Sequence, residues 1–462
     1  MTAKKATKRL SSIEEIPSIM SKLGRPGIFY LPGNASCMPT VEKEIQRQSA
    51  QLIGWRGFQL LSMLGGWETV FRNVRMATPF IGKGLRKLVN AGGADFIPCH
   101  LSELWRLLDD QWCPDVAFFH VSPFDEHGVT TLGVDAGISH FAYEAALRKG
   151  TIMIAVVNKQ MPRFHVEPTR LKYRGKKLMT GCPAHFRDFD YYVEIDEPII
   201  RHKMGVIDEV SRRIGENVAK CIPNGACVQL GIGGIPDAVT VALRGHHGLG
   251  LHSELASNGA LDLIERGVIT GGSKSLLRGK HVIGFALGDE KMYAALSDER
   301  FAILPQRFVN DPRIIGRNVR MHNVNSALAV TFFGDVCAST RQSSEGMQFY
   351  SGMGGAFDFA LGANMSEGGC SIIALPSTYR DNSGRLQSRI CDMLPVGSHM
   401  TAGNESIRVF ATEWGAVDTT GLTIRDRLDA MISIAHPDFR RILEIQASHL
   451  PGTHRTLCGK VV

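Results

Sequence analysis

Short apolar runs alternate with helical patterns along the whole chain. Eight runs have the length and apolar content of buried strands, at residues 27–31, 116–121, 152–157, 226–230, 282–287, 327–333, 371–375 and 407–411. Four segments repeat apolar residues at helical spacing, at residues 41–52, 206–222, 236–244 and 424–434. Strands separated by helices are typical of parallel sheets with both faces covered. The pattern therefore predicts an α/β fold with mainly parallel sheets.

Two loops resemble each other and indicate an internal repeat. The strand predicted at 27–31 is followed by a loop from Gly33, and Pro39 then opens a helix. The strand predicted at 226–230 is followed by a loop from Gly231, and Pro236 opens a helix. Proline suits the first position of a helix because its φ is fixed and it has no N–H. We therefore expect two related α/β domains, residues 1–210 and 211–462.

Composition and charge exclude several classes of protein. The chain has 462 residues, with 52 Lys and Arg against 45 Asp and Glu, so its net charge is +7. The basic residues are interleaved with acids, which argues against a nucleic-acid partner. No run approaches the ~20 apolar residues that span a bilayer, so we expect no membrane partner.

The first fifteen residues have no apolar core and do not resemble a secretory signal. Two interpretations stay open for this Lys-rich segment: a transit peptide, or a solvated tail before a helix. Ser11 and Ser12 each precede an acid by three residues, Glu14 and Glu15. This spacing resembles a capping box, which opens a helix.

The ten cysteines are scattered, with no C-x-x-C pair and no Cys/His cluster at zinc spacing. We expect reduced thiols in a cytoplasmic protein, and no metal site. Asp125, Glu126 and His127 stand side by side after the strand predicted at 116–121. With Pro123 before them and Gly128 after them, they are typical of a turn, since adjacent turn residues rarely converge on one ion.

Two glycine-rich loops could lie against a ligand. Gly231, Ile232, Gly233 and Gly234 follow a predicted strand and precede a helix, where backbone N–H groups can hold an anion or a carbonyl oxygen. The dinucleotide fingerprint is incomplete, so a nicotinamide site is not indicated. The second loop contains three glycines and would let a ligand approach closely: Gly352, Gly354 and Gly355. Ordinary turns remain the alternative for both loops.

Two acids follow apolar runs at which strands should end. Glu254, after His252 and Ser253, would lie at the rim of a parallel sheet, where open α/β sheets bind ligands. A solvated surface acid is the alternative. Ser253 has no G-x-S-x-G context, so a serine nucleophile is not indicated. Glu413 also follows a predicted strand, and the pattern does not decide between a site residue and an exposed acid.

Taken together, these segments resemble the acetyl-CoA hydrolase/transferase family of class I coenzyme A transferases, which includes 4-hydroxybutyrate, butyrate and itaconate CoA-transferases. The resemblance spans about residues 28–445 and depends on the order of many segments. They are GADFIPCHLSEL (93–104), VSPFDEHGVTTLG (121–133), VVNKQMP (156–162), QLGIGGIPDAV (229–239), LHSELASNGALDLIERGVIT (251–270), SGMGGAFDFALGANMSEGG (351–369), TEWGA (412–416) and IAHPDFR (434–440).

The resemblance implies two α/β domains of related topology with the active site between them, and a nucleophile in the second domain. It maps the nucleophile onto Glu254. It maps the oxyanion hole and coenzyme A site onto the backbones of the two glycine loops, and further site residues onto Asn325 and Glu413. Ala356 stands where relatives often have Gln in the second loop.

The resemblance implies a CoA-transferase that moves coenzyme A between a short-chain acyl-CoA and a free carboxylate, through a glutamyl-CoA thioester on Glu254. With a usual pKa of ~4.3, Glu254 would be ionised at pH 7. Coenzyme A and acyl-CoA would be substrates, with no permanently bound cofactor, and the enzyme would be a cytoplasmic homo-oligomer. An acyl-CoA hydrolase using the same glutamate and a non-catalytic acyl-CoA-binding protein are the alternatives.

Overall fold

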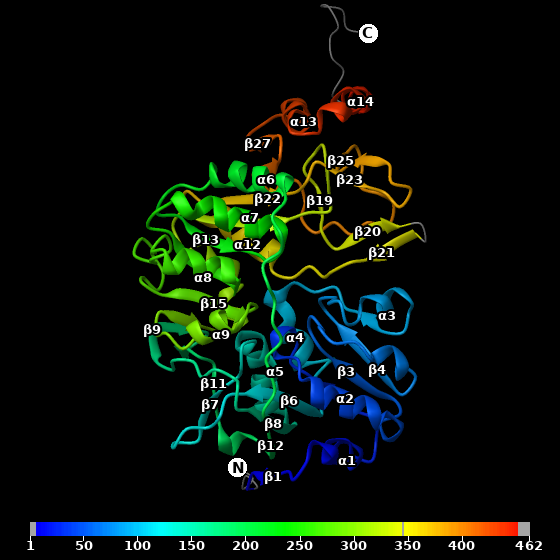
Figure 1. Cartoon of the computed structure of the whole chain (residues 1–462), viewed down its shortest axis with the longest axis vertical. Helices are drawn as coiled ribbons and strands as arrows, with labels where there is room; N and C mark the ends of the chain where they lie inside the picture. The colour runs from blue at the N-terminus through cyan, green and yellow to red at the C-terminus, as the bar shows by residue number, and fades with distance from the viewer. Residues whose placement is uncertain (1–5, 344–345, 451–462) are drawn as a thin grey trace, which may run out of the picture.

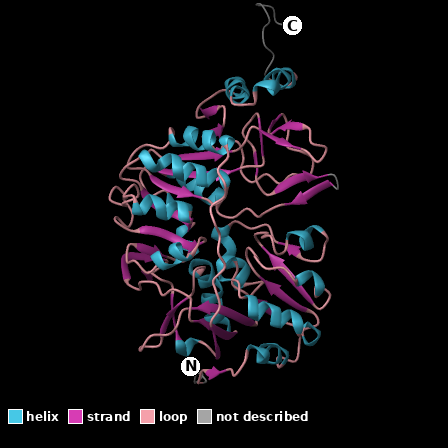
Figure 2. Ribbon diagram, viewed as in Figure 1, coloured by secondary structure: helices cyan, strands magenta, loops and turns pink. Residues whose placement is uncertain are grey.

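A computed structural model describes residues 6–343 and 346–450 as two α/β halves. In Figure 1 the N-terminal half, coloured blue to teal, lies below the C-terminal half, coloured green to red. Helices lie against the strands in both halves, as the secondary-structure colours of Figure 2 show. In the described residues, no helix is both long and apolar enough to cross a membrane.

The N-terminal half is built on an eight-stranded parallel sheet. Its strands lie in the order β1 (Lys8–Arg9), β12 (Tyr191–Ile195), β8 (Ile152–Asn158), β6 (Val116–Val121), β2 (Ile28–Tyr30), β3 (Trp55–Phe58), β4 (Val74–Thr78) and β5 (Asp95–Phe96). The helices of this half are α1 (Ile16–Ser21), α2 (Pro39–Arg47), α3 (Arg86–Asn90), α4 (Leu104–Asp109) and α5 (Ala136–Lys149). Two small pairs complete it, β7 (Val129–Thr131) with β11 (Pro183–His185) and β9 (Pro168–Tyr173) with β10 (Lys176–Met179).

The C-terminal half has a second eight-stranded sheet, in which only β27 is antiparallel. Its order is β16 (Phe301–Ile303), β15 (His281–Ala286), β14 (Gly250–Ala256), β13 (Cys227–Leu230), β17 (Met321–Ser326), β22 (Cys370–Ala374), β26 (Val409–Thr412) and β27 (Gly415–Asp418). Its helices are α6 (Glu209–Ala219), α7 (Gly234–Ala242), α8 (Asn258–Glu265), α9 (Glu290–Ala295), α10 (Gln306–Val309), α11 (Pro312–Ile315), α12 (Ala356–Met365), α13 (Ile424–Ser433) and α14 (Pro437–Ser448).

Short strands beside the second sheet form a group of hairpins at the upper right of Figure 1. They are β18 (Ala329–Thr331) with β19 (Val336–Cys337) and β25 (Ile390–Cys391), β20 (Thr340–Ser343) with β21 (Gly346–Phe349), and β23 (Thr378–Arg380) with β24 (Leu386–Ser388). Strand β21 contacts helix α3 of the N-terminal half. The hairpins therefore reach the boundary between the halves.

The two large sheets share one topology. In each, a central first strand (β2 or β13) has the next three strands on one side. The other side holds β6, β8 and β12 in the first sheet, and β17, β22 and β26 in the second. This order confirms the predicted α/β fold with two related halves and mainly parallel sheets. The domain boundary near residue 210 stays a prediction.

All but one of the predicted strands lie in the two large sheets. The exception is residues 327–333, which contain the short β18 of a small sheet, while the strand in the large sheet is β17. The sequence of β17, MHNVNS, is polar although its first four residues are buried. Its position in the middle of the sheet supplies hydrogen bonds and burial that an apolar pattern does not predict.

Two predictions about helix starts have different outcomes. Pro39 is the first residue of α2, as predicted. The same prediction is wrong for Pro236, because α7 already begins at Gly234 and Pro236 is its third residue. The first three helical positions have no intrahelical N–H partner, so proline is tolerated there as well.

The N-terminal segment is partly ordered against the first sheet. Ser12 and Glu15 form the predicted capping box and open a 3₁₀ turn at Ile13–Glu15 that runs into α1. The interpretation of residues 1–15 as a solvated tail is wrong for its second part, because β1 pairs in parallel with β12. Residues 1–5 lie outside the described part of the chain.

Candidate active site

Glu254 lies on β14, on the central part of the second sheet. Leu251 of β14 pairs with Val228 of β13, so Glu254 and Gly231 stand at the same height on neighbouring strands. Because side chains alternate along a strand, His252 and Glu254 point to the same face of the sheet. The strand was predicted to end at this acid, but β14 ends two residues later, at Ala256.

The two residues before Glu254 have structural roles. His252 is fully buried, with its Nε2 2.9 Å from the Val309 carbonyl oxygen and its Nδ1 3.3 Å from Asn318 Nδ2. Burial lowers the pKa of His252 to about 3, so the ring is neutral. The hydroxyl of Ser253 bonds to the backbone of Leu230, the last residue of β13. Both side chains are thus held by bonds within the C-terminal half.

The carboxyl group of Glu254 is held by two donors. Asn310 Nδ2 donates to Glu254 Oε2 at 2.9 Å. The backbone N–H of Gly355, at the N-terminal end of α12, also donates to this carboxylate. A helix N-terminus favours negative charge, so the second donor acts together with the helix dipole. Glu254 as a whole residue is only partly buried.

The second glycine loop lies directly against Glu254. A Cβ atom added at Gly355 would be 1.9 Å from Glu254 Oε2, so any other residue there would displace the carboxyl group. Gly354 adopts φ +55°, and a Cβ there would be 3.0 Å from the ring of Phe80. At Gly352 a Cβ would be 2.5 Å from the Pro79 carbonyl oxygen. The loop is therefore enclosed between Glu254 and the N-terminal half.

Asn310 belongs to a buried network of polar side chains. Its Oδ1 accepts from Gln306 Nε2 at 2.5 Å, which orients the amide so that Nδ2 faces the carboxylates. The same Nδ2 is 3.5 Å from Asp358 Oδ2. Asp358 in turn accepts from Ser102, from the backbone N–H at 3.0 Å and from the hydroxyl at 2.7 Å. Ser102 comes from the N-terminal half, so the network joins both halves at Glu254.

Two acids in this network have raised pKa values. Burial raises the pKa of Glu254 to about 7, and the charge of Asp358 adds to the shift, while the bonds from Asn310 and Gly355 oppose it. Burial also raises the pKa of Asp358 to about 6, against the hydrogen bonds from Ser102. The raised pKa works against the expectation that Glu254 is ionised at pH 7, because its environment disfavours the charge.

The other predicted site residues line the same edge of the second sheet without a recorded contact to Glu254. Gly231, Ile232, Gly233 and Gly234 are partly exposed, and a Cβ at Gly233 would have no atom within 4 Å. Asn325 is near the end of β17, beside this loop, and its Nδ2 is buried with no hydrogen-bond partner in the described residues. These positions fit a ligand-facing edge, and their roles stay predictions.

Glu413 lies at the same edge, just after β26. Both of its carboxylate oxygens accept from Ser377, one from the backbone N–H at 2.8 Å and one from the hydroxyl. The Trp414 indole also donates to the Ser377 hydroxyl, at 3.2 Å. Glu413 is thus fixed by local bonds, and its role in the site stays a prediction.

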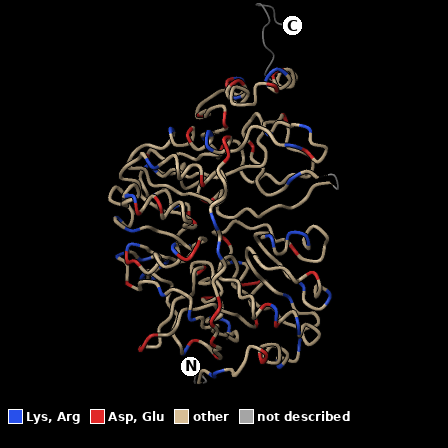
Figure 3. The backbone as a smooth tube through the Cα atoms, in the orientation of Figure 1, with Lys and Arg blue, Asp and Glu red and all other residues tan. Residues whose placement is uncertain are grey.

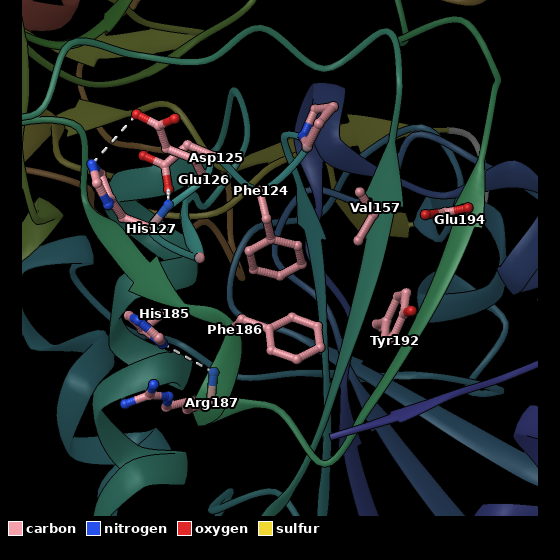
Figure 4. Close-up of a pocket in the computed structure, with 12 residues that line it drawn as sticks. Phe124, Asp125, Glu126, His127, Val157, His185, Phe186, Arg187, Tyr192 and Glu194 are labelled. Carbon is pink, nitrogen blue, oxygen red and sulfur yellow. Dashed lines mark hydrogen bonds and ion pairs between the residues drawn. The ribbon is translucent and has the colours of Figure 1, made fainter. Parts of the chain in front are cut away.

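The segment 122–128 forms the predicted turn. Asp125 Oδ1 accepts from the backbone N–H groups of His127 and Val129, and Gly128 adopts φ +72°. A pocket of about 540 Å³ lies beside the turn. Phe124 and Phe186 line it with their rings next to each other (Figure 4). In the described residues, no group of three or more His, Cys, Asp or Glu side chains is arranged to hold a metal ion.

Sequence reasoning missed Asn310 and Asp358 as parts of the site. Ser102 and Asp358 both lie in segments that carried the family resemblance, 93–104 and 351–369, so a signal for them was present. Asn310 had no such signal, because it stands in a short loop between α10 and α11. Its contact with Glu254 bridges 56 positions of the chain and depends on the fold.

Comparison with known proteins gives the family of the chain. Residues 59–168 match the family described as "Acetyl-CoA hydrolase/transferase N-terminal domain", and residues 288–447 match "Acetyl-CoA hydrolase/transferase C-terminal domain". Together these matches cover more than half of the chain.

Several relatives are similar to the chain over most of its length. A 4-hydroxybutyrate coenzyme A transferase from Clostridium kluyveri is 36% identical over 381 residues, which are 81% of this chain and 82% of that protein. A succinyl-CoA:cyclohexane-1-carboxylate CoA transferase from Geobacter metallireducens is 35% identical, over 77% and 76% of the two chains. The crystal structure of RipA from Yersinia pestis superimposes with a TM-score of 0.82 at 28% identity, over 96% and 97%. The chain therefore belongs to the acetyl-CoA hydrolase/transferase family and is an enzyme of the CoA-transferase class.

Proposed function

We propose that this enzyme transfers coenzyme A from a short-chain acyl-CoA to a free carboxylate through a thioester on Glu254. The observation that carries the proposal is the environment of that carboxylate, which is buried and accepts hydrogen bonds from Asn310 Nδ2 and the Gly355 N–H. The resemblance to transferases of small acids supports the substrate class. Acyl-CoA and carboxylate enter as substrates, so no permanently bound cofactor is required.

The reaction has two balanced half-reactions. The Glu254 carboxylate attacks the thioester carbonyl, the C–S bond breaks, and an acyl-glutamyl anhydride and CoA thiolate form. The thiolate then attacks the Glu254 carbonyl, which expels the donor carboxylate and leaves glutamyl-CoA. An acceptor carboxylate repeats these steps in reverse and leaves as the new acyl-CoA. A positioned carboxylate is a recognised covalent catalyst.

The donors around Glu254 fit the second attack. When the thiolate adds to the glutamyl carbonyl, negative charge develops on the oxygen that remains on Glu254. Asn310 Nδ2 and the Gly355 N–H already point at this carboxyl group. Preorganised donors of this kind are worth roughly 10²–10³ each in rate. The backbone of the first glycine loop, on the neighbouring strand, would serve the thioester oxygen in the first attack.

The test is an intact-mass experiment on the full chain. The protein is incubated with a panel of short acyl-CoAs without an acceptor acid, and the adduct is mapped by peptide mass. We expect a mass gain of CoA less one water on Glu254, absent in Glu254→Ala and discharged by added acetate. The Glu254→Gln variant is the matched control, because it keeps the size of the side chain and one acceptor oxygen while removing the nucleophile.

Two other outcomes would replace the proposal. Fast release of CoA without an acceptor, abolished in Glu254→Gln, would identify an acyl-CoA hydrolase. Tight acyl-CoA binding with neither adduct nor turnover across the panel would identify a binding protein. Water must be excluded for transfer to win, since the anhydride hydrolyses readily.

A further inference from the structure

A second cavity lies where a hairpin of the N-terminal half meets the C-terminal half, outside the network around Glu254. It has a volume of about 420 Å³ and lies between the hairpin β9–β10, helix α5 and helix α10. A cavity of this size can hold a small ligand. Lys and Arg positions of the hairpin lie at the left edge of Figure 3, where Figure 1 labels β9. We call the cavity the hairpin pocket, and its basic lining residues are Arg148, Arg174, Lys176, Lys177 and Arg307.

The two walls of the hairpin pocket are tied together at α10. The Tyr173 hydroxyl, at the end of β9, lies 3.0 Å from the Arg307 carbonyl oxygen and 3.0 Å from Asp311 Oδ2, and can donate to either. The Tyr173 ring packs edge-on against Phe308, with the ring centres 5.4 Å apart. The hairpin of the N-terminal half is therefore anchored on the helix that forms the opposite wall.

The hairpin pocket has more positive charge than its carboxylates can pair. Its lining contains one acid, Glu144, which pairs with Lys176 at 3.6 Å. Arg148 pairs with Asp109. In the residues that the structure describes, the other three basic side chains have no carboxylate within 4 Å of their charged groups: Arg174, Lys177 and Arg307. Three cations are thus left for an anion.

Two of these cations are held beside one aromatic ring. The guanidinium of Arg307 lies 3.5 Å from the ring centre of Trp105, and that of Arg174 lies 5.3 Å from it. A guanidinium stacked on a ring keeps the N–H donors in its plane available to an oxyanion.

The backbone at the tip of the hairpin also points to a role for Arg174. Arg174 and Gly175 form a two-residue turn in which both residues have positive φ, +50° and +79°. Turns of this type favour asparagine before glycine, because few other side chains tolerate the left-handed backbone. An arginine at this position is strained, which indicates that its side chain is needed there.

Helix α10 connects the hairpin pocket to the candidate active site. Arg307 follows Gln306, whose Nε2 donates to Asn310 Oδ1 at 2.5 Å. Asn310 comes directly after the helix and donates to Glu254 at 2.9 Å. Because α10 has only four residues, a ligand that holds Arg307 should restrict the whole helix.

We propose that the hairpin pocket binds a small multivalent anion of the phosphate class, and that the bound anion holds α10 in place. Guanidinium groups bind phosphate oxygens through paired hydrogen bonds, and a lysine adds a point charge. This ligand is separate from the acyl-CoA substrate, so the inference goes beyond the proposed function and does not depend on it. The anion acts from a second site on the group that donates to Glu254.

The experiment measures binding of inorganic pyrophosphate to the full chain by titration calorimetry, with sodium chloride at the same ionic strength as the reference. The variants are Arg174→Gln and Lys177→Gln, because both side chains are exposed and their loss should not affect folding. Arg170→Gln is the matched control, since this exposed arginine lies on β9 of the same hairpin but does not line the pocket. Arg307→Gln is added with a melting curve, because that side chain also packs on Trp105.

We expect the Kd of pyrophosphate to rise about tenfold or more in Arg174→Gln and in Arg307→Gln, as for hydrogen bonds to charged groups. It should rise several-fold in Lys177→Gln and stay unchanged in Arg170→Gln. Binding should persist with saturating coenzyme A, and bound pyrophosphate should slow hydrogen exchange at the amides of α10. No binding beyond the sodium chloride reference, equal weakening in Arg170→Gln, or displacement by coenzyme A would overturn the binding site. Unchanged exchange in the bound protein would overturn the effect on α10.

A second probe distinguishes the two sources of such an anion. Fructose 1,6-bisphosphate carries its phosphate groups on a larger molecule, whereas pyrophosphate is a free ion. Tighter binding of the bisphosphate, lost in Arg174→Gln, would support a site for a phosphorylated metabolite. Tighter binding of pyrophosphate, lost in the same variant, would support a site for the free ion.

Discussion

At the scale of single residues, the site depends on how the negative charge of one carboxyl group is disfavoured while the group is held in place. Burial and the nearby charge of Asp358 raise the pKa of Glu254, while Asn310 and Gly355 lower it. A higher pKa makes a carboxylate more basic and a better nucleophile, while the two donors keep it oriented. Together, the raising and lowering effects place the pKa of Glu254 near neutral pH. The rate at which this carboxylate reacts should therefore change steeply over the physiological pH range.

The first prediction concerns the pH dependence of adduct formation. The carboxylate is the reactive form and the pKa of Glu254 is raised to about 7, so protonation suppresses the reaction below that pH. The first-turnover rate should rise about tenfold from pH 6 to pH 8, as expected for one group titrating at 7. Rapid-quench mass spectrometry measures this rate. Asp358→Asn should move the midpoint to lower pH, and a rate that is constant from pH 6 to 8 would contradict the assignment.

The second prediction concerns the amide of Asn310. Asn310→Ala removes a donor that stabilises the charged form of Glu254, so the pH midpoint should move upward and kcat should fall by roughly 10²–10³. Asn318→Ala is the control, because Asn318 is a buried amide in the same segment that contacts His252 rather than Glu254. It should lower the melting temperature without moving the pH midpoint. If the pH midpoint of the reaction moves equally in both variants, the role of Asn310 is only structural.

At the scale of elements, the strands of the large sheets that form long apolar runs could be predicted from sequence, whereas short or polar strands such as β3, β4 and β17 could not. The fully buried run of β6 has an apolar pattern of strand length, and its bounds were predicted correctly. Strand β17 was not predicted because His322 and Asn323 are polar although they are buried in the sheet, so the strand has no apolar pattern. Glu254 was predicted as a site residue because its segment resembles a family motif, and its role stays a prediction. Asn310 was not found, because only the packing of α10 against β14 brings it to the carboxylate.

The third prediction tests the closeness of the second glycine loop to the nucleophile. Gly355→Ala would place a methyl group 1.9 Å from Glu254 Oε2 and 2.1 Å from Asn310 Nδ2, so the carboxyl group must move. We expect kcat to fall at least ~100-fold, because misplacement by about 1 Å has costs of this size. Gly245→Ala is the control, since a Cβ there meets nothing within 4 Å. An active Gly355→Ala enzyme would show that Glu254 reacts from another position.

At the scale of the whole molecule, the two halves complete one site. The Leu101 N–H donates to the Gly354 carbonyl oxygen at 3.0 Å, and Ser102 donates to Asp358. The second glycine loop is therefore held from the N-terminal half as well as by its own helix. The same boundary is closed elsewhere by α5, which packs on β15 of the C-terminal half. Catalysis should thus be sensitive to changes at this boundary, even at positions without a recorded contact to Glu254.

The last prediction tests this sensitivity at Gly137 on α5. A Cβ there would lie 2.5 Å from the Gly284 carbonyl oxygen and 2.6 Å from that of Leu304, both backbone atoms of the other half. Gly137→Ala should destabilise the protein by about 1–3 kcal/mol through overpacking and separate the halves slightly. The separation should speed hydrogen exchange at the Leu101 and Ser102 amides and lower kcat.

A matched control separates this effect from a general loss of stability. A Cβ at Gly215 would lie 2.6 Å from the Ala238 carbonyl oxygen, a contact between α6 and α7 within the C-terminal half. Gly215→Ala should therefore lower the melting temperature by a similar amount while leaving exchange at Leu101 and Ser102 unchanged. If both variants change that exchange equally, the boundary between the halves does not control the loop. If only Gly137→Ala changes that exchange, the N-terminal half influences Glu254. The recorded link between them consists of the side chains of Ser102, Asp358 and Asn310.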